Sequence, residues 1–265
     1  VSEKKFVFCG CIGLIFGIEI LGSGPQIFLY ISFMLFLYIA LRMLYEKKEL
    51  LKISSGLLLA VILGVMIGSV QLMPMLEYNK YSIRSEGLAY DTASMHSLPG
   101  YALITFLMPE FFGRGELYWG FWKYSSFSEQ YIYVGLVTLV LLLMAMFFVR
   151  KNKYASIFAI MALFAILFSF GKYLPIFWLF HKLPLFSAFR APVRMMVFFV
   201  FSAAVISGLS LDALSSIDYR KKKIIQNILF ALGILLFIAA VTAVLSYIEK
   251  DKIIDRENGK DINLT

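Results

Sequence analysis

Long uncharged runs, separated by short charged clusters, constrain this chain more than any other feature of its sequence. Lys52 and Glu77 bracket 24 uncharged residues, and Lys223 and Glu249 bracket 25. A helix needs about 20 predominantly apolar residues to cross the hydrocarbon core of a bilayer. Charged residues make up only 16% of the chain, whereas soluble globular proteins carry about 25%. The sequence therefore predicts an integral membrane protein.

The same runs predict an all-α fold, a polytopic bundle of transmembrane helices. Backbone groups in lipid are satisfied only within helices or closed β-barrels, and barrel strands alternate in hydrophobicity over about ten residues. The runs in this chain are longer than such strands and apolar on every side. We expect residues 1–265 to form a single transmembrane region with about seven spans. The predicted spans are 6–21, 27–45, 53–73, 131–149, 154–170, 195–214 and 224–247.

The positive charge is distributed in a way that predicts orientation. Four short segments outside the predicted spans (1–5, 46–52, 150–153 and 218–223) hold 12 Lys or Arg in 22 residues, whereas the alternate segments hold 12 in 104. Cytoplasmic loops of membrane proteins carry such an excess of Lys and Arg. We therefore expect the N-terminus inside and the C-terminus outside, and the net charge of +8 does not indicate a nucleic-acid partner.

Two segments on the predicted outer face are candidates for function. The loop 74–130 is long, and nine aromatic residues fall within 101–124. This density predicts a loop folded against the membrane, with a short interfacial helix over 98–108 and other interfacial helices. The segment 171–194 contains Pro175, Pro184 and Pro192, which predict an interfacial or re-entrant segment in place of a continuous span.

Arg190 and Arg194 are the most suggestive charged pair. They flank Pro192 just outside the sixth predicted span, where two guanidinium groups could hold a phosphate through bidentate hydrogen bonds. The alternative is that both side chains reach lipid headgroups without a specific ligand. Trp119 and Trp122 in the outer loop leave a similar choice between stacking on a sugar ring and belonging to an aromatic belt at the interface.

The titratable residues select no catalytic group. Glu19 lies near the outer end of the first predicted span, where it is either functional or a carboxylate in contact with interfacial water. The outer loop adds further candidates whose geometry the sequence does not give. They are Glu77, Arg84, Asp91, His96, Glu110, Glu116 and Glu129.

No metal or cofactor is expected from the sequence. His96 and His181 stand without metal-ligand spacing around them. The two cysteines, Cys9 and Cys11, both lie in the first predicted span and are interpreted as packing residues. No phosphate-binding loop or dinucleotide fingerprint occurs.

Six stretches in order along the chain resemble motifs of the YfhO family of bacterial membrane proteins. In that family Gly24 is often replaced by His or another polar residue. The matching stretches are 24–26 (GPQ), 71–77 (QLMPMLE), 107–113 (LMPEFFG), 129–135 (EQYIYVG), 189–194 (FRAPVR) and 208–214 (GLSLDAL).

This resemblance implies a protein similar to GT-C glycosyltransferases, in the cell membrane of a bacterium. Members of that group transfer a sugar from a polyprenyl-phosphate carrier on the outer face of the membrane, and YfhO-like proteins are associated with glycosylation of teichoic acids, cell-envelope polymers. The catalytic carboxylate of GT-C enzymes usually lies in the first large outer loop. No segment here matches that loop, so we expect this chain to be an internal part of a longer protein that begins after it.

The resemblance and the predicted topology together give a site hypothesis in which the catalytic residue is not identified. We expect a phosphate-binding cavity shared by Arg190, Arg194, Glu77, Glu129 and the hairpin of Gly24, Pro25 and Gln26, with Trp119 and Trp122 contacting the sugar. Two other functions remain open at this point. One is a transporter or flippase of lipid-linked sugars, and the other is a membrane partner without chemistry of its own.

Overall fold

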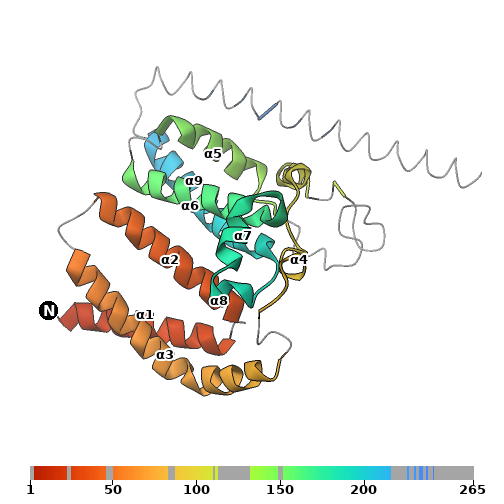
Figure 1. Cartoon of the computed structure of the whole chain (residues 1–265). Helices are drawn as coiled ribbons and strands as arrows, with labels where there is room; N and C mark the ends of the chain where they lie inside the picture. The colour runs from red at the N-terminus through yellow and green to blue at the C-terminus, as the bar shows by residue number, and fades with distance from the viewer. Residues whose placement is uncertain are drawn as a thin grey trace, which may run out of the picture. The chain divides into compact units, whose positions relative to one another are not determined.

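The computed structural model describes residues 3–22, 25–45, 50–82, 87–109, 111–112, 132–148 and 152–215, together with six single positions between 226 and 241. All regular structure in this part of the chain is helical (Figure 1). The all-α prediction is therefore confirmed for the described residues.

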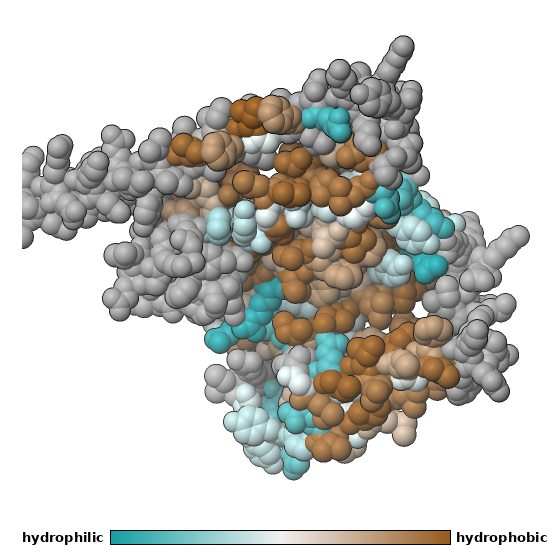
Figure 2. Space-filling model, turned by 180° about the vertical axis from the view of Figure 1, so that it is seen from behind, coloured by the Kyte–Doolittle hydropathy of each residue, from teal (hydrophilic) through white to brown (hydrophobic). Residues whose placement is uncertain are grey.

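Within the described residues, three helical stretches are long and apolar enough to cross a membrane. They lie in α2 (Pro25–Tyr45), in α3 (Leu50–Lys80), and in η7 (Pro192–Met195) continued by α9 (Met196–Ser215). The candidate spans themselves are Gln26–Tyr45, Ser55–Lys80 and Pro192–Leu214. Hydrophobic side chains also cover much of the surface seen in Figure 2. Both features fit a membrane protein.

Three further predicted spans coincide with shorter apolar stretches, which lie in α1 (Glu3–Gly22), α5 (Leu136–Phe148) and α6 (Lys153–Ser169). The stretches themselves are Val7–Gly22, Leu136–Ala145 and Lys153–Ser169. The 13 residues of α5 are about 20 Å long, less than the roughly 30 Å of a bilayer core. The seventh predicted span, 224–247, lies outside the described residues except for single positions. Three of the seven predicted spans thus meet the requirement for length and composition.

The third predicted span ends later than expected. The sequence placed its end at residue 73 and the start of the outer loop at Pro74, but α3 continues through Pro74 to Lys80. Proline removes one backbone hydrogen bond and usually kinks a helix without having to end it. The residues that follow, Met75, Leu76 and Glu77, all favour helix, so the helix resumes its pattern after the proline.

One compact unit consists of residues 1–97 and 160–199, and in it α1 packs along α3 through glycines. A Cβ atom added at Gly17 would lie 2.5 Å from Cγ2 of Ile67. One added at Gly64 would lie 2.5 Å from the Phe16 Cβ and 3.1 Å from the Gly13 carbonyl oxygen. The two backbones therefore approach as closely as in the small-residue interfaces of membrane helices.

A cluster of aromatic rings fills the core of the same unit. It joins α2, α6, α7 (Pro175–His181) and α8 (Pro184–Ser187). Neighbouring ring centroids lie 5.2 to 6.3 Å apart, mostly in edge-to-face arrangements, which is the preferred geometry of aromatic pairs. The members are Tyr30, Phe33, Phe164, Phe168, Phe177, Phe180 and Phe186.

The prolines of segment 171–194 begin helices. Pro175, Pro184 and Pro192 occupy the first turns of α7, α8 and η7, and η6 (Gly171–Tyr173) precedes them. Proline suits the first turn because the missing N–H has no partner there and φ is already helical. As the prolines predicted, the segment is not one continuous helix, and it contains four short helices.

The second compact unit consists of residues 98–159 and 200–265. It contains η2 (Gly100–Phe106), which falls inside the range 98–108 where a short helix was expected. The side chain of Asn152 caps the start of α6 by accepting hydrogen bonds from the N–H groups of Tyr154 and Ala155, at 2.9 and 3.3 Å. In the same unit, the rings of Phe158 and Phe201 meet edge to face at 6.0 Å.

Candidate functional site

A buried amide links the start of α2 to the turn before α9. The Arg194 Nη1 group donates to Oε1 of Gln26 at 3.0 Å. The Gln26 Nε2 group donates to the carbonyl oxygen of Arg190 and, at 3.2 Å, to the hydroxyl of Tyr30. Exchanging the amide oxygen and nitrogen would set donor against donor and acceptor against acceptor, so these partners fix the orientation of the side chain.

The turn at residues 190–194 is strained and held on several sides. Ala191 has φ +62°, a left-handed conformation that costs a residue with a side chain about 1–3 kcal/mol. Its N–H donates to the carbonyl oxygen of Ala93 at 3.1 Å. The Ser169 hydroxyl donates to the carbonyl oxygen of Pro192 at 3.3 Å. The turn therefore keeps a conformation that places both arginines next to Gln26.

Part of the predicted outer loop is hydrogen-bonded to this turn and to the segment before it. The Leu88 N–H donates to the carbonyl oxygen of Ser187 at 2.9 Å, and the Val193 N–H donates to that of His96 at 3.4 Å. The Lys172 N–H donates to the Ser97 hydroxyl at 2.9 Å. Residues 87–97, which include α4 (Tyr90–Ala93), are thus fastened to segment 171–194 mainly through backbone groups.

His181 adds a side-chain link to the same segment. Its Nε2 lies 2.9 Å from the carbonyl oxygen of Leu88, and because a carbonyl only accepts, Nε2 carries the proton. The Tyr90 ring meets the imidazole edge to face at 5.5 Å. Burial, reinforced by the neighbouring Asp91 carboxylate, raises the pKa of the Tyr90 phenol. Tyr90 therefore stays neutral at physiological pH.

The charged side chains around this turn are mostly cationic. Segment 171–194 contains Lys172, Lys182, Arg190 and Arg194, and the sequence has no Asp or Glu between Glu129 and Asp212. On the face predicted to lie outside, the positive-inside rule leads one to expect few cations. Arg190 is exposed and Arg194 is half-buried. Segment 171–194 therefore carries four cationic side chains and no carboxylate of its own.

The structure brings together three of the predicted site residues, namely Gln26, Arg190 and Arg194. Pro25 opens α2 immediately before Gln26. Glu77 is exposed near the end of α3, and within the described residues no hydrogen bond or ion pair links it to either arginine. The remaining members, Gly24, Trp119, Trp122 and Glu129, lie outside the described residues.

Two parts of the site were not predicted from the sequence. Tyr30 lies one helical turn after Gln26, a spacing that places both on one face of α2 and was available in the sequence. Residues 87–97 were not expected at the site. Their contacts are made mainly by backbone groups, which almost every residue type has, so the sequence does not indicate these contacts.

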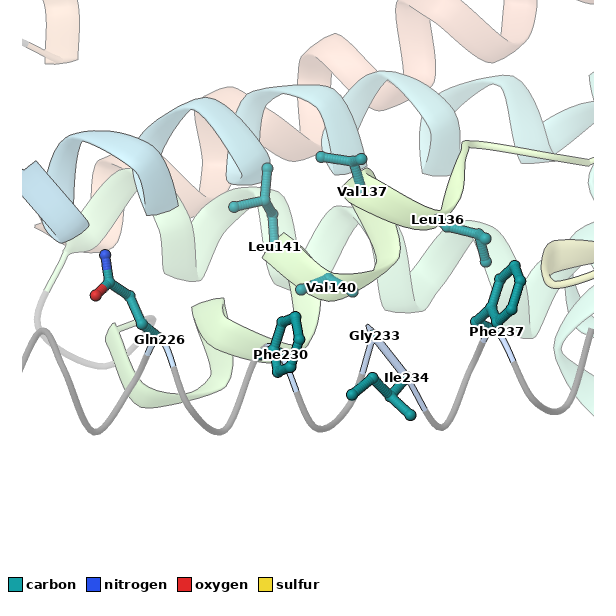
Figure 3. Close-up of a pocket in the computed structure, with 9 residues that line it drawn as sticks. All are labelled: Leu136, Val137, Val140, Leu141, Gln226, Phe230, Gly233, Ile234 and Phe237. Atoms are coloured by element: carbon teal, nitrogen blue, oxygen red, sulfur yellow. The ribbon is translucent and has the colours of Figure 1, made fainter.

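A groove in the second unit has a different character (Figure 3). It has a volume of about 590 Å³ and is apolar apart from Gln226. Such a lining could contact a hydrocarbon chain, and it contains no cationic side chain that could bind a phosphate. The lining residues are Leu136, Val137, Val140, Leu141, Gln226, Phe230, Gly233, Ile234 and Phe237.

Within the described part of the chain, no cluster of three or more His, Cys, Asp or Glu side chains could hold a metal ion. Cys9 is half-buried beside Gly56 of α3, and Cys11 is exposed. Of the two cysteines interpreted as packing residues, the structure thus places Cys9 against another helix.

Comparison with known protein families, curated proteins and solved structures finds no match to this chain.

Proposed function

We propose that this chain is the membrane-embedded part of a GT-C-like glycosyltransferase in a bacterial cell membrane. It would bind a polyprenyl-phosphate sugar at the outer face and serve the glycosylation of a cell-envelope polymer such as teichoic acid. The observation that carries the proposal is the Arg194 guanidinium, held by the buried Gln26 amide where two candidate spans begin.

The position of this cation matches the place where a lipid phosphate would lie. Gln26 is the first residue of one candidate span, and Arg194 lies in the first turn of another. The N-terminal ends of both helices therefore lie together at one membrane boundary. Helix N-termini carry partial positive charge, which adds to that of the guanidinium. The carrier's phosphate would lie at this boundary, with its isoprenoid chain in the bilayer.

A guanidinium is suited to this task because it offers five N–H donors in a planar fork. The Nη1 group of Arg194 donates to Gln26, and this hydrogen bond fixes the direction of the fork. A phosphate monoester or diester would accept two parallel hydrogen bonds from such a fork. An ammonium group cannot make that contact in the same geometry.

The full site and topology are part of the same proposal. Seven spans with the N-terminus inside would bring Glu77, Glu129, Gly24 and Pro25 to the boundary occupied by Gln26 and the arginines. Trp119 and Trp122 would contact the sugar. The acceptor polymer would approach from outside, and the catalytic carboxylate would come from a part of the protein other than this chain.

The proposal predicts that Arg194→Lys lowers sugar transfer by the full-length protein about ten- to hundredfold. This range corresponds to the loss of a charge-assisted hydrogen bond worth about 1.5–3 kcal/mol. The measurement is transfer of labelled sugar from the polyprenyl carrier in membranes with matched protein levels. Arg42→Lys, in the last turn of α2, is the matched control and should retain transfer. If Arg194→Lys transferred sugar as fast as the original protein, Arg194 would not bind the carrier's phosphate.

A further inference from the structure

The outward side of α7, together with η6 and the turn after α7, combines large apolar side chains with cations. Trp178, Leu179 and Leu183 are 47%, 61% and 49% exposed, whereas Phe177 on the inward side is 1% exposed. The inward rings belong to the aromatic core, so α7 is fixed to the unit by one side only. The other side presents an apolar surface without a described partner helix.

Two lysines border this surface and rest on its aromatic rings. The Lys182 Nζ lies 3.4 Å from the centroid of the Trp178 ring, and the Lys172 Nζ lies 5.4 Å from that of Tyr173. A cation over an aromatic face is stabilised by the ring quadrupole. Because no Asp or Glu occurs between positions 129 and 212, segment 171–194 itself supplies no carboxylate to neutralise these lysines.

The depth of α7 relative to α2 indicates what this surface meets. The Phe180 ring contacts that of Phe33 at 5.2 Å. Phe33 lies seven residues after Gln26, which begins the candidate span, so the contact is about 10 Å along the helix from its start. Interfacial helices bury their apolar face about 5–10 Å into the boundary between headgroups and acyl chains. The two depths agree.

We propose that α7 and η6 form an interfacial anchor that binds anionic phospholipid. Trp178, Leu179 and Leu183 lie among the upper acyl chains, and the ammonium groups of Lys172 and Lys182 contact headgroup phosphates. Anionic headgroups attract lysine side chains electrostatically, and aromatic and apolar side chains at this depth are buried among the acyl chains. The inference does not depend on sugar transfer, and it concerns the bulk lipid beside the unit.

The test uses Trp178 as a fluorescent probe in the full chain, reconstituted in vesicles. The protein has three tryptophans, so Trp119→Phe with Trp122→Phe leaves Trp178 alone. Lipids brominated near the top of the acyl chain should quench its emission more than lipids brominated near the end. Should that variant fail to fold, the difference between the original chain and Trp178→Phe isolates the same signal.

The anionic preference is measured by comparing brominated phosphatidylglycerol with brominated phosphatidylcholine. Phosphatidylglycerol should be favoured, and Lys172→Gln with Lys182→Gln should reduce the preference about fivefold for each lysine. Lys153, whose ammonium stacks on Tyr154 at the start of α6, provides the matched control, and Lys153→Gln should leave the preference intact.

Three results would overturn the proposal. Strong quenching by aqueous iodide with none by brominated lipid would place Trp178 in water. Protection from both quenchers would mean that a protein surface covers α7. Equal quenching of the original chain by brominated phosphatidylglycerol and brominated phosphatidylcholine would show that the lysines do not select anionic lipid.

Discussion

Replacing Gly17 with Leu is expected to force α1 away from α3 and to destabilise the folded protein by about 3 kcal/mol or more. Overpacking a well-packed core typically costs 1–3 kcal/mol and occasionally more. Here even a Cβ at Gly17 would lie 2.5 and 2.6 Å from the Cγ2 and Cβ of Ile67, atoms close to the α3 backbone. Ile67 cannot rotate away, so the helices must separate. Denaturant unfolding in detergent micelles, followed by circular dichroism, measures the loss.

Gly10 provides the matched control on the same helix. A Cβ added at Gly10 would meet nothing within 4 Å, so Gly10→Leu changes helix propensity and hydrophobicity without introducing a clash. We expect Gly10→Leu to retain the stability of the original chain. Equal stability of the two leucine variants would show that the close approach of α1 and α3 does not support the fold.

Replacing Gly171 with Ala is expected to cost about 2–4 kcal/mol and to loosen residues 87–97. The residue has φ +51°, which costs a side-chain-bearing residue about 1–2 kcal/mol. The added Cβ would lie 2.0 Å from the Ser97 Oγ and 2.7 Å from the Pro192 Cγ, and overpacking adds a further cost. Ser97 must then move, although its hydroxyl accepts the Lys172 N–H. Denaturant unfolding and protease sensitivity around residue 90 report both effects.

Two variants separate this clash from a general effect of alanine. Gly100→Ala, at a position where a Cβ meets nothing within 4 Å, should leave stability nearly unchanged. Combining Ser97→Gly with Gly171→Ala removes the Ser97 Cβ and Oγ that the added methyl group would meet. The double variant should therefore lose less free energy of unfolding than the sum of the two single variants. Strict additivity of the two substitutions, or a stable Gly171→Ala protein, would contradict the described packing.

The helices were predictable because their signals are local. The second and fifth spans, expected at 27–45 and 154–170, correspond to α2 at Pro25–Tyr45 and α6 at Lys153–Ser169. Apolar runs set their lengths, Pro25 opens α2, and Asn152 caps α6. The end of α3 was predicted wrongly, because Pro74 was interpreted as a stop although the residues after it favour helix.

The site was only partly predictable because it depends on tertiary contacts. The predicted topology alone grouped Gln26 with Arg190 and Arg194, and the structure joins them by hydrogen bonds across more than 160 positions of sequence separation. The left-handed conformation of Ala191 could not be predicted from its residue type, because alanine rarely adopts this conformation. Its N–H and that of Val193 donate to carbonyl oxygens of residues 93 and 96, and side-chain patterns do not record such contacts.

The most direct test of the central claim is the affinity of the full-length protein for polyprenyl phosphate and for the corresponding polyprenol, measured in lipid nanodiscs. We expect the original protein to prefer the phosphate and Arg194→Lys to reduce this preference about ten- to hundredfold. Affinity for polyprenol, which lacks the phosphate, should change little. An unchanged preference for the phosphate in Arg194→Lys would contradict the assignment of Arg194 to the carrier's phosphate.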